Sequence, residues 1–446
     1  MERIKRAGPP VFIVALAAGV IGYILGCTNA EQDNLSQALA AQPDQNATDD
    51  PRTGGNAQVP AQESNRARLS EPNARVANPY SYFPGTEKLD KDEVRIVACG
   101  TGMPAARRGQ AAACFLVELG NGDKFLFDIG TGSMANIMSL NIPADFLRKI
   151  FLSHLHTDHW GDLDSIWAGG WTGGRTGPLE VWGPSGFRED MGTKYAIDGF
   201  MRAYNWDYVT RAVKISSVPG QIKVHEFDYK GINEAIYDEN GVVIRSIPAI
   251  HAGDGPVSFI LEWNGYKIVY GGDTAPNRWF MNHCKGSDFI IYECMLTPEQ
   301  LMDFYGQPAQ RAMMMQTDIH TSAQAFGKIM STLTPRHAVA YHFFNEEATR
   351  YAIYDAIRQT YAGPLSMADD MMVWNITRDG VRERMAVSPD DAWDVAGPTP
   401  PPLPDKKFPP QESDFILDGR WDVSDVEDKA FRDFRSRHNL PQSKQQ

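Results

Sequence analysis

The stretch that most constrains this chain is "SHLHTDHWGD", residues 153–162, which holds three of the 10 histidines in the protein. A surface loop has no need of imidazoles at alternate positions, and a core accepts several polar rings only when each has a partner. The preceding "KIF" is typical of a strand, so donor atoms crowd the point where a strand ends. Neutral imidazoles and carboxylates are typical zinc ligands, so the stretch predicts half of a metal site.

The spacing within this stretch predicts two groups of ligands. In an extended segment, His154 and His156 point to the same side of the chain. A turn after them lets Asp158 and His159 face a second point nearby. The alternative is a polar turn that is held by hydrogen bonds and binds no metal.

Further donor residues follow other apolar runs along the chain. His251 follows "VIRSIPAI", Asp273 follows "YKIVYGG", and His342 follows "HAVAY". Loops at strand ends commonly carry chemistry, although a single histidine there is more often held by ordinary hydrogen bonds. Together and in this order, the three residues would complete two metal sites.

The apolar pattern predicts a layered α/β fold. Strands are expected in "VRIVACG", "AACFLVEL", "KFLFDIG" and several later runs, and they alternate with helical segments such as "MANIMSLNI". The turns "NGD" and "WNGY" predict hairpins, so the sheets cannot be entirely parallel. The segment "FREDMGTKYAIDGFMRAYNWDYVTRAVKI" within residues 187–240 is expected to be helical.

We divide the chain into four parts by composition. These are an export or anchor segment (1–27), a disordered tether (28–85), a folded α/β domain (86–388) and a proline-rich tail (389–446). The first part has a basic start, a short apolar run and the sequence "ILGCTN", which resembles a bacterial lipobox with Cys27 as the lipidated residue. An uncleaved signal anchor and an ordinary cleaved signal are the alternatives. All three place the domain outside the cytoplasm, and the first two attach it to a membrane, so we expect a periplasmic, membrane-anchored protein.

The acidic balance of the chain argues against nucleic acid as a partner. The formal net charge is -13 and the sequence pI is about 5.3, whereas proteins that bind nucleic acid carry basic patches. We therefore expect a small-molecule partner.

The roles of several other residues stay open at the level of sequence. Cys99 and Cys114 could pair across a hairpin or be buried thiols, and pairing of Cys284 with Cys294 is not expected. Arg175 could meet an anionic group or lie in solvent. A set of aromatic and methionine residues could line a pocket or pack the core: Trp160, Trp167, Trp171, Trp182, Met313, Met314 and Met315.

The order of the donor residues resembles that of the metallo-β-lactamase-fold hydrolases, over roughly residues 90–387, and "HLHTDH" and "GGDT" are its most specific parts. The resemblance implies a four-layer αββα sandwich and a cofactor of two Zn²⁺ ions per chain. It implies that His154, His156 and His251 bind one zinc, that Asp158, His159 and His342 bind the other, and that Asp273 bridges them. Asp128 in "FDIGTG" would support the ligand loop. Lactamases of this superfamily lack the bridging aspartate, so β-lactamase activity is not expected.

Other motifs resemble the ribonuclease Z and arylsulfatase branch of these hydrolases, and a group labelled guanitoxin-biosynthesis-type hydrolases. They are "GTGMP", "WAGGW", "PLEVWGPSG" and "HTSAQAFGKI". In that branch, the residue that matches His320 is an additional catalytic histidine; the alternative is a residue at a helix start without a catalytic role. Residues 187–240 lack the flexible basic arm of transfer-RNA-processing members, so transfer RNA is a poor candidate substrate.

The resemblance implies an exported dinuclear zinc hydrolase that attacks sulfate or phosphate esters with a metal-bridging hydroxide. Asp158 or His320 would supply or orient the proton for the leaving group. The alternatives are a lactonase or carboxylesterase on the same site, a mononuclear iron dioxygenase, and a binding protein that kept the fold. Related hydrolases often dimerise, which leaves a homodimer open.

Overall fold

The computed structural model describes residues 78–105, 107–390, 397, 399, 402–404 and 412–441. The export or anchor segment with Cys27, and the tether as far as residue 77, lie outside the described residues. Among the described residues, no helix is both long enough and apolar enough to span a membrane.

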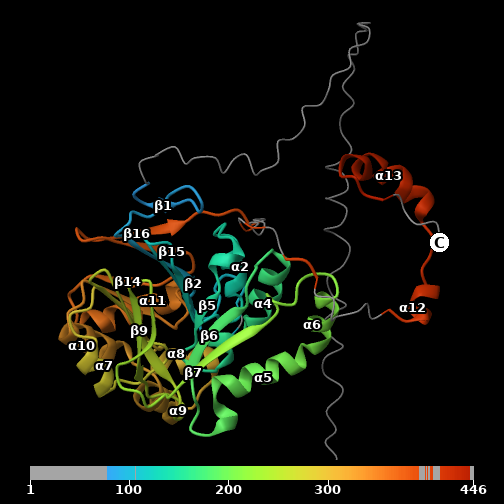
Figure 1. The fold of residues 1–446 in the computed structure, drawn as a ribbon. Helices are drawn as coiled ribbons and strands as arrows, with labels where there is room; N and C mark the ends of the chain where they lie inside the picture. The colour runs from blue at the N-terminus through green and yellow to red at the C-terminus, as the bar shows by residue number, and fades with distance from the viewer. Residues whose placement is uncertain are drawn as a thin grey trace, which may run out of the picture. The chain divides into compact units, whose positions relative to one another are not determined.

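Two mixed β-sheets form the centre of the fold (Figure 1). The first sheet has the spatial order β1 (Ser81–Tyr82), β16 (Val381–Ala386), β15 (Met372–Ile376), β2 (Val94–Gly100), β3 (Cys114–Leu119), β4 (Lys124–Phe127), β5 (Lys149–Phe151), β6 (Leu179–Pro184) and β7 (Ile222–Phe227). The second sheet has the order β14 (Leu365–Met367), β13 (His337–Tyr341), β12 (Phe289–Glu293), β11 (Tyr266–Tyr270), β10 (Val257–Trp263), β9 (Val242–Pro248) and β8 (Glu234–Glu239).

Aromatic side chains fill the space between the two sheets. Phe127 of the first sheet contacts Phe259 and Tyr270 of the second, with ring centroids 5.6 and 5.8 Å apart. Phe115 packs edge-on against Tyr341 with a centroid distance of 5.2 Å. Alternate residues of a strand face the same side of a sheet, so each strand contributes a row of such rings to this shared core.

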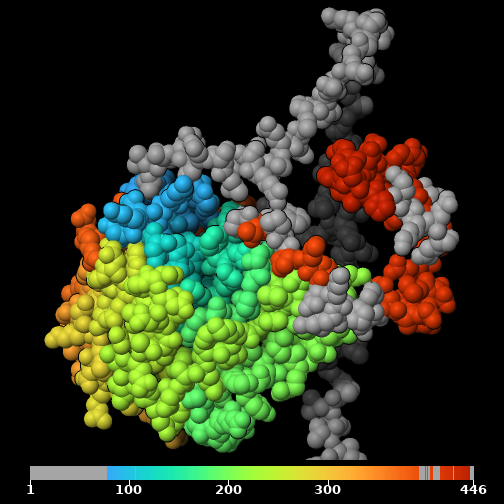
Figure 2. All heavy atoms as spheres, in the orientation of Figure 1, coloured from blue at the N-terminus to red at the C-terminus, as the bar shows by residue number. Residues whose placement is uncertain are grey.

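Helices cover the two outer faces and complete four layers (Figure 1). The first sheet is covered by α2 (Ser133–Met138), α4 (Leu163–Thr172), α5 (Thr193–Ala203) and α6 (Asn205–Ala212). The second sheet is covered by α7 (Arg278–His283), α8 (Pro298–Tyr305), α9 (Ala309–Met314), α10 (Ala323–Leu333) and α11 (Glu347–Arg358). In the space-filling view, the sheets and their helices form one continuous body (Figure 2). The expected α/β fold with an αββα sandwich is confirmed.

The structure decides most of the roles that the sequence left open. All four described cysteines are free and buried, so of the two alternatives for Cys99 and Cys114 the structure shows buried thiols. Trp167 and Trp171 pack in the core beneath α5 and α6, and each indole N–H donates to a backbone carbonyl. Trp182 stacks on Phe151 with a centroid distance of 4.8 Å. Packing, not pocket lining, is the role of these three tryptophans.

Arg175 corrects both sequence-based interpretations of that residue. Its side chain is buried, and its guanidinium donates to the backbone carbonyls of Ile166, Trp167 and Pro219. These bonds tie α4 to the segment before β7. Arg175 therefore neither lies in solvent nor faces an anionic ligand. Its guanidinium supplies the hydrogen-bond donors that three clustered, buried backbone carbonyl groups require.

Helices form after residue 187 as the sequence predicted, whereas the first strand lies within residues 78–85, which the sequence composition assigns to the disordered tether. The stretch between residues 187 and 215 forms α5 and α6, as expected. In the tail, α12 (Asp414–Asp418) and α13 (Ser424–Arg437) are helical. Strand β1 lies before residue 86 and pairs in parallel with β16.

We predict that a chain truncated to begin at Asn78 folds with an unchanged thermal midpoint, whereas one that begins at Glu87 is destabilised. The Asn78 side chain accepts hydrogen bonds from the backbone N–H groups of Tyr80 and Ser81, and Tyr82 is buried against Arg95. Loss of one buried aromatic ring costs about 2–3 kcal/mol. Denaturant unfolding of the two truncated chains checks this. Equal stability would mean that β1 contributes nothing to the domain.

Candidate metal centre

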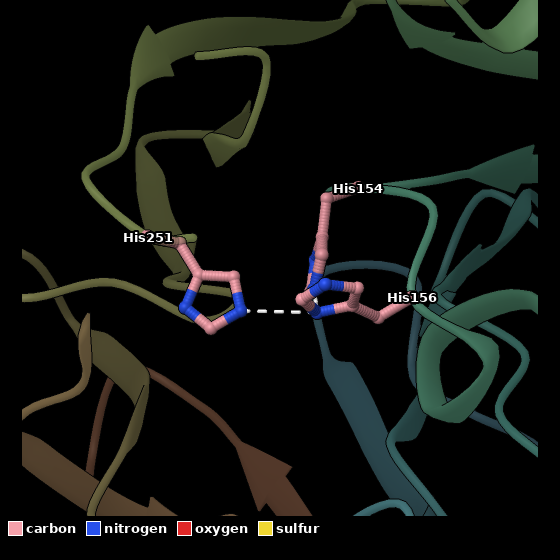
Figure 3. Close-up of side chains that lie close together, drawn as sticks. All are labelled: His154, His156 and His251. Atoms are coloured by element: carbon pink, nitrogen blue, oxygen red, sulfur yellow. Dashed lines mark hydrogen bonds between the residues drawn. The ribbon is translucent and has the colours of Figure 1, made fainter. Parts of the chain in front are cut away.

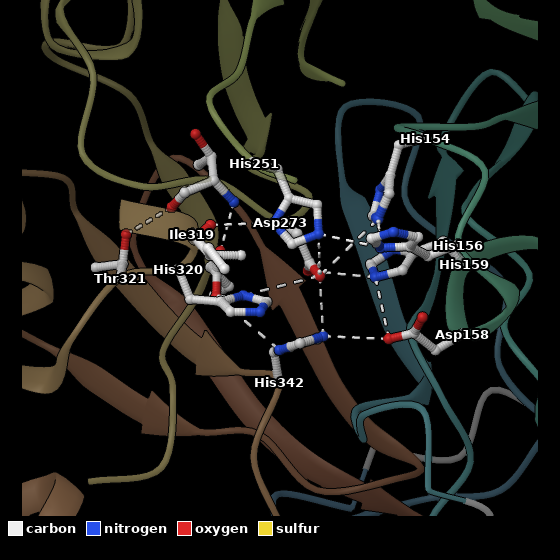
Figure 4. A network of polar contacts seen from close by, with 12 residues as sticks. His154, His156, Asp158, His159, His251, Asp273, Ile319, His320, Thr321 and His342 are labelled. Carbon is white, nitrogen blue, oxygen red and sulfur yellow. Dashed lines mark hydrogen bonds and ion pairs between the residues drawn. The ribbon is translucent and has the colours of Figure 1, made fainter. Parts of the chain in front are cut away.

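The seven predicted ligands come from loops at the ends of strands in both sheets. After β5, the chain passes through His154 and His156 into the short helix α3 (Thr157–Trp160), which carries Asp158 and His159. The remaining three follow strands of the second sheet: His251 after β9, Asp273 after β11 and His342 after β13. Figure 4 shows all seven side chains converging on one region between the sheets.

The first cluster is a triangle of imidazoles formed by His154, His156 and His251 (Figure 3). The three ring centroids are 4.7, 4.9 and 5.0 Å apart, with interplanar angles of 72–75°. The Nδ1 atom of His156 lies 3.1 Å from Nε2 of His154 and 3.0 Å from Nε2 of His251. Nitrogens bound to one tetrahedral zinc are roughly 3.4 Å apart. The cluster therefore has nearly the spacing of three ligands around one ion.

Hydrogen bonds on the far sides of the rings set which nitrogens carry lone pairs. His251 Nδ1 faces the carbonyl of Ile319 at 3.0 Å and must donate, which leaves Nε2 with its lone pair. The Ser153 hydroxyl donates to Asp128, so His154 Nδ1, 3.1 Å away, donates to Ser153. Both Nε2 lone pairs therefore point into the triangle. A single N–H on His156 could satisfy only one of them, whereas a metal ion satisfies all three nitrogens.

The second cluster contains Asp158, His159, Asp273 and His342. The Nε2 atom of His159 lies 3.2 Å from Oδ1 of Asp273, and Nε2 of His342 lies 3.1 Å from its Oδ2. The Oδ2 atom of Asp158 is 3.3 Å from His342 and 3.6 Å from His159.

Asp273 also borders the first cluster. Its Oδ2 is 4.0 Å from His154 Nε2 and 3.7 Å from His251 Nε2. This carboxylate thus lies between the two clusters, where the sequence places the bridging ligand. Gly272 before it has φ of 60°, and a Cβ atom there would stand 2.7 Å from the Ser153 Cβ, so only glycine lets the two loops approach this closely.

Asp128 fixes the ligand loop from behind. Its carboxylate accepts from His159 Nδ1 at 2.6 Å, from the Tyr270 hydroxyl at 2.6 Å and from Ser153 through both N–H and hydroxyl at 2.7 Å. Donation to Asp128 fixes the His159 ring so that Nε2 faces the second cluster, where a metal ion could displace its proton. Asp128 and His342 both have positive φ, 56° and 73°. This costs a non-glycine residue about 1–2 kcal/mol, and such strain commonly concentrates at functional sites.

Electrostatics differ between the two clusters. Burial lowers the pKa of His154 well below its usual value and that of His251 to about 4, so these rings stay neutral. Burial also disfavours charge on His342, but the carboxylates of Asp273 and Asp158 outweigh it and raise its pKa to about 10. The same balance, with Asp273 and Asp128, raises the pKa of His159. Protons on two histidines thus balance the buried carboxylates, a role that a bound cation takes over when it displaces them.

Unpartnered polar atoms support metal binding. Among the described buried side chains, the polar atoms without a hydrogen bond include Asp158 Oδ1, His159 Nε2 and Asp273 Oδ1, although the last two face each other at 3.2 Å. Native proteins rarely leave such groups unsatisfied. All three atoms belong to the second cluster, and nitrogen and carboxylate oxygen suit zinc. The residues present therefore fit two metal ions that share Asp273.

Comparison with known proteins agrees with this geometry. Residues 107–281 match the family model described as the metallo-beta-lactamase superfamily. The chain contains a metallo-beta-lactamase superfamily domain. The matched range includes six of the seven predicted ligands, and His342 lies beyond it.

Known relatives of the metallo-beta-lactamase domain include ribonuclease Z proteins. The chain is 30% identical over 189 residues to ribonuclease Z from Mycobacterium marinum, covering 41% of this chain and 64% of that relative. It is 26% identical over 289 residues to ribonuclease Z from Mycobacterium avium, covering 62% of this chain and 96% of the relative.

Two solved structures resemble the domain at lower identity. One is the metallo-beta-lactamase fold protein YhfI from Bacillus subtilis, at 17% identity and a TM-score of 0.48, covering 64% of this chain and 100% of that chain. The other is the short form of human tRNase Z, at 20% identity and a TM-score of 0.45, covering 64% and 98%.

His320 lies beside the metal clusters of the domain, but not at a helix start as the sequence suggested. It directly follows a π-helical turn, η4 (Met315–Ile319), in extended backbone, and α10 begins three residues later with Ser322 as its cap. The ring is mostly buried, with its centroid 4.8 Å from that of His251 and 5.2 Å from that of His342. Such π-helical turns are frequent at functional sites.

Glu293 is the residue of the site that sequence reasoning missed. It ends β12, is fully buried, and its Oε2 accepts from His320 Nδ1 at 2.8 Å. Burial raises the pKa of Glu293; burial also disfavours charge on His320, but the Glu293 carboxylate raises the pKa of that ring. The pair holds a proton between Nδ1 and Oε2, which leaves His320 Nε2 for another partner. The available signal was the carboxylate at the end of the apolar run "DFIIYE", at the same strand edge as the ligands.

A cavity of about 250 Å³ opens beside the second cluster. His320, Asp158, Asp273 and His342 contribute polar walls. The apolar walls come mainly from Met103, Met295, Leu301, Tyr305, Met315 and Ile319. Of the predicted aromatic and methionine pocket residues, only Met315 takes part. We call this space the His320 cavity.

Proposed function

We propose that this protein is a dinuclear zinc hydrolase that acts on sulfate or phosphate esters of small molecules. The observation that carries the proposal is the pair of ligand clusters that share Asp273, with His320 within ring contact of both. An iron dioxygenase with one metal needs no second cluster, so Asp158, His159 and His342 favour the dinuclear alternative.

The residues around the site would have different roles in ester hydrolysis. Zinc, when bound, would supply a water molecule that is activated at neutral pH. The metal would also neutralise negative charge that develops on the substrate. Asp158 and His342 would both hold zinc in the second cluster, and His320 lines the cavity while Glu293 fixes its ring through Nδ1. We assign His320 to proton donation at the leaving oxygen, which suits an acid held by a buried carboxylate.

A small substrate is favoured over transfer RNA, although relatives bear the name ribonuclease Z. Among the described residues, neither lysine nor arginine lines the His320 cavity, and the chain is acidic. A polyanion needs cationic contacts to balance its charge. The part of the chain in which a transfer-RNA-processing enzyme is expected to carry a basic arm, within residues 187–240, contains helices α5 and α6 instead.

The experiment is a panel of p-nitrophenyl sulfate, p-nitrophenyl phosphate, bis(p-nitrophenyl) phosphate and an aryl lactone, tested on zinc-loaded protein and on the same protein after chelation. The proposal expects hydrolysis of a sulfate or phosphate ester that is lost on chelation and returns with zinc. Turnover of the lactone alone would favour the carboxylesterase alternative. Retention of full activity after complete metal removal would contradict the proposal.

We further propose that the domain is exported and held at a membrane through Cys27. The motif "LGC" after an apolar run supports lipidation of this residue. We predict that the parent chain, expressed in a bacterial host with radiolabelled palmitate, carries the label and that the Cys27→Ser variant does not. Label on the variant would contradict lipidation at Cys27, and an unlabelled parent chain in the membrane fraction would favour an uncleaved anchor.

A further inference from the structure

The metal centre lies between two cavities rather than at the bottom of one. The His320 cavity lies on the side of the second cluster. A second cavity of about 230 Å³ lies on the side of His154. The two cavities share His156, His251 and Ala252 as walls, so they meet at the first cluster. We call the second space the Phe187 cavity.

The Phe187 cavity is apolar and partly open. Besides the three imidazoles, its walls include Leu155, Pro184, Phe187, Met191 and Pro256. Phe187 and Met191 are 50% and 48% exposed, although burial of such side chains is favourable. Large apolar side chains left around a concave surface next to a reactive centre are typical of ligand sites.

The charges around both cavities restrict what can enter them. Among described wall residues, neither cavity has a lysine or an arginine. In the Phe187 cavity, the charged wall residue other than histidine is Asp254, whose carboxylate accepts from the Tyr229 hydroxyl at 3.0 Å. A negatively charged group would meet the Asp254 carboxylate there. The Arg188 guanidinium, 5.2 Å from the centroid of the Phe187 ring, is already paired with Asp190, so the cavity suits an uncharged apolar group.

We propose that the Phe187 cavity is the subsite for the retained organic group of the substrate, and that Phe187 and Met191 determine its specificity. The leaving group then occupies the His320 cavity, because His320 can reach its oxygen only there. This inference rests on the proposed hydrolase function and narrows it. A sulfate or phosphate monoester has one organic group and leaves the Phe187 cavity empty. The fitting substrate is a phosphodiester with an uncharged apolar group on each side of phosphorus.

Binding of two stable monoanions to the zinc-loaded full chain tests the proposal. Diphenylphosphinate has two phenyl groups on phosphorus, and phenylphosphinate has one; neither has an ester bond to hydrolyse. Calorimetric titration should show that Phe187→Ala weakens diphenylphosphinate binding about tenfold and leaves phenylphosphinate within twofold, because only the first ligand reaches that ring. Met191→Ala should act in the same direction. The matched control is Phe146→Ala, a phenylalanine that is 46% exposed and lines neither cavity.

The possible outcomes separate this inference from the proposed function. Equal loss of both ligands in Phe187→Ala, or no loss of either, would overturn the subsite. A p-nitrophenyl monoester turned over as efficiently as bis(p-nitrophenyl) phosphate would also overturn it, while the hydrolase function would stand. If the zinc-loaded protein hydrolyses no ester of the panel, the proposed function fails. Selective loss of diphenylphosphinate binding would then still support the cavity as a binding site.

Discussion

An Asp273→Ala variant should lose one or both metal ions and at least a thousandfold in turnover. Asp273 lies within 4.0 Å of ligand nitrogens from both clusters. Its removal would take a ligand from each ion and leave three protein ligands in each cluster. The loss of a shared ligand weakens metal binding more than the loss of a peripheral group, and apo sites do not hydrolyse esters. Metal content measured by elemental analysis beside kcat/KM checks this result.

The change in thermal stability on addition of zinc tests the Asp273 prediction without an activity assay. Zinc at one hundred times its Kd adds about 2.7 kcal/mol to the stability of a protein that binds it only when folded. The parent chain should therefore gain thermal stability when zinc is added, and Asp273→Ala should gain much less. The control is Asp198→Ala, whose exposed carboxylate pairs with Lys194 away from the site. A variant that keeps two metal ions and full turnover would contradict the bridging role of Asp273.

A His320→Ala variant should keep both metal ions and lose roughly 10²–10⁴-fold in turnover on substrates with poor leaving groups, the usual effect of one positioned acid. His320 lies outside the two ligand clusters described above. It forms a third group of donor side chains with Asp273, Glu293 and His342, and its Nδ1 is already bonded to Glu293. The loss in turnover should be smaller for substrates that release nitrophenolate, because this leaving group needs no proton. The measurement is kcat/KM against the pKa of the leaving group, together with zinc content.

A structural role for His320 would give a different pattern. Turnover would then fall by a similar factor for every leaving group, and the thermal midpoint would fall with it. His283→Ala is the matched control, because His283 lies on α7 and outside the metal clusters and the His320 cavity. An unchanged dependence on leaving-group pKa would contradict proton donation. Loss of zinc would mean that His320 is a ligand.

The sequence predicted the ligands because they depend on local rules. A polar residue directly after an apolar strand must emerge at a sheet edge, and two sheets that pack face to face bring their edges together. His154 and His251 could therefore be placed without knowing the rest of the fold. Asp128 was predicted from the resemblance of "FDIGTG" to the family motif and not from this rule.

Residues whose partners lie far away in the sequence could not be placed in this way. In the sequence alone, Glu293 is only the last residue of an apolar strand. The packing of η4 in the folded domain is what brings His320 to it. Arg175 reads as a loop arginine, yet three carbonyl groups from separate segments surround it. The cavity walls are also assembled from distant loops: Met103, Leu301 and Met315 meet only in the folded domain.

Metal content is the most direct test of the dinuclear site. The full chain should be purified without chelators, dialysed against metal-free buffer, and analysed for zinc and iron per chain. The two clusters that share Asp273 predict two zinc ions per chain and little iron. A single iron ion per chain, or one zinc ion that does not rise to two when zinc is added, would contradict the dinuclear hydrolase.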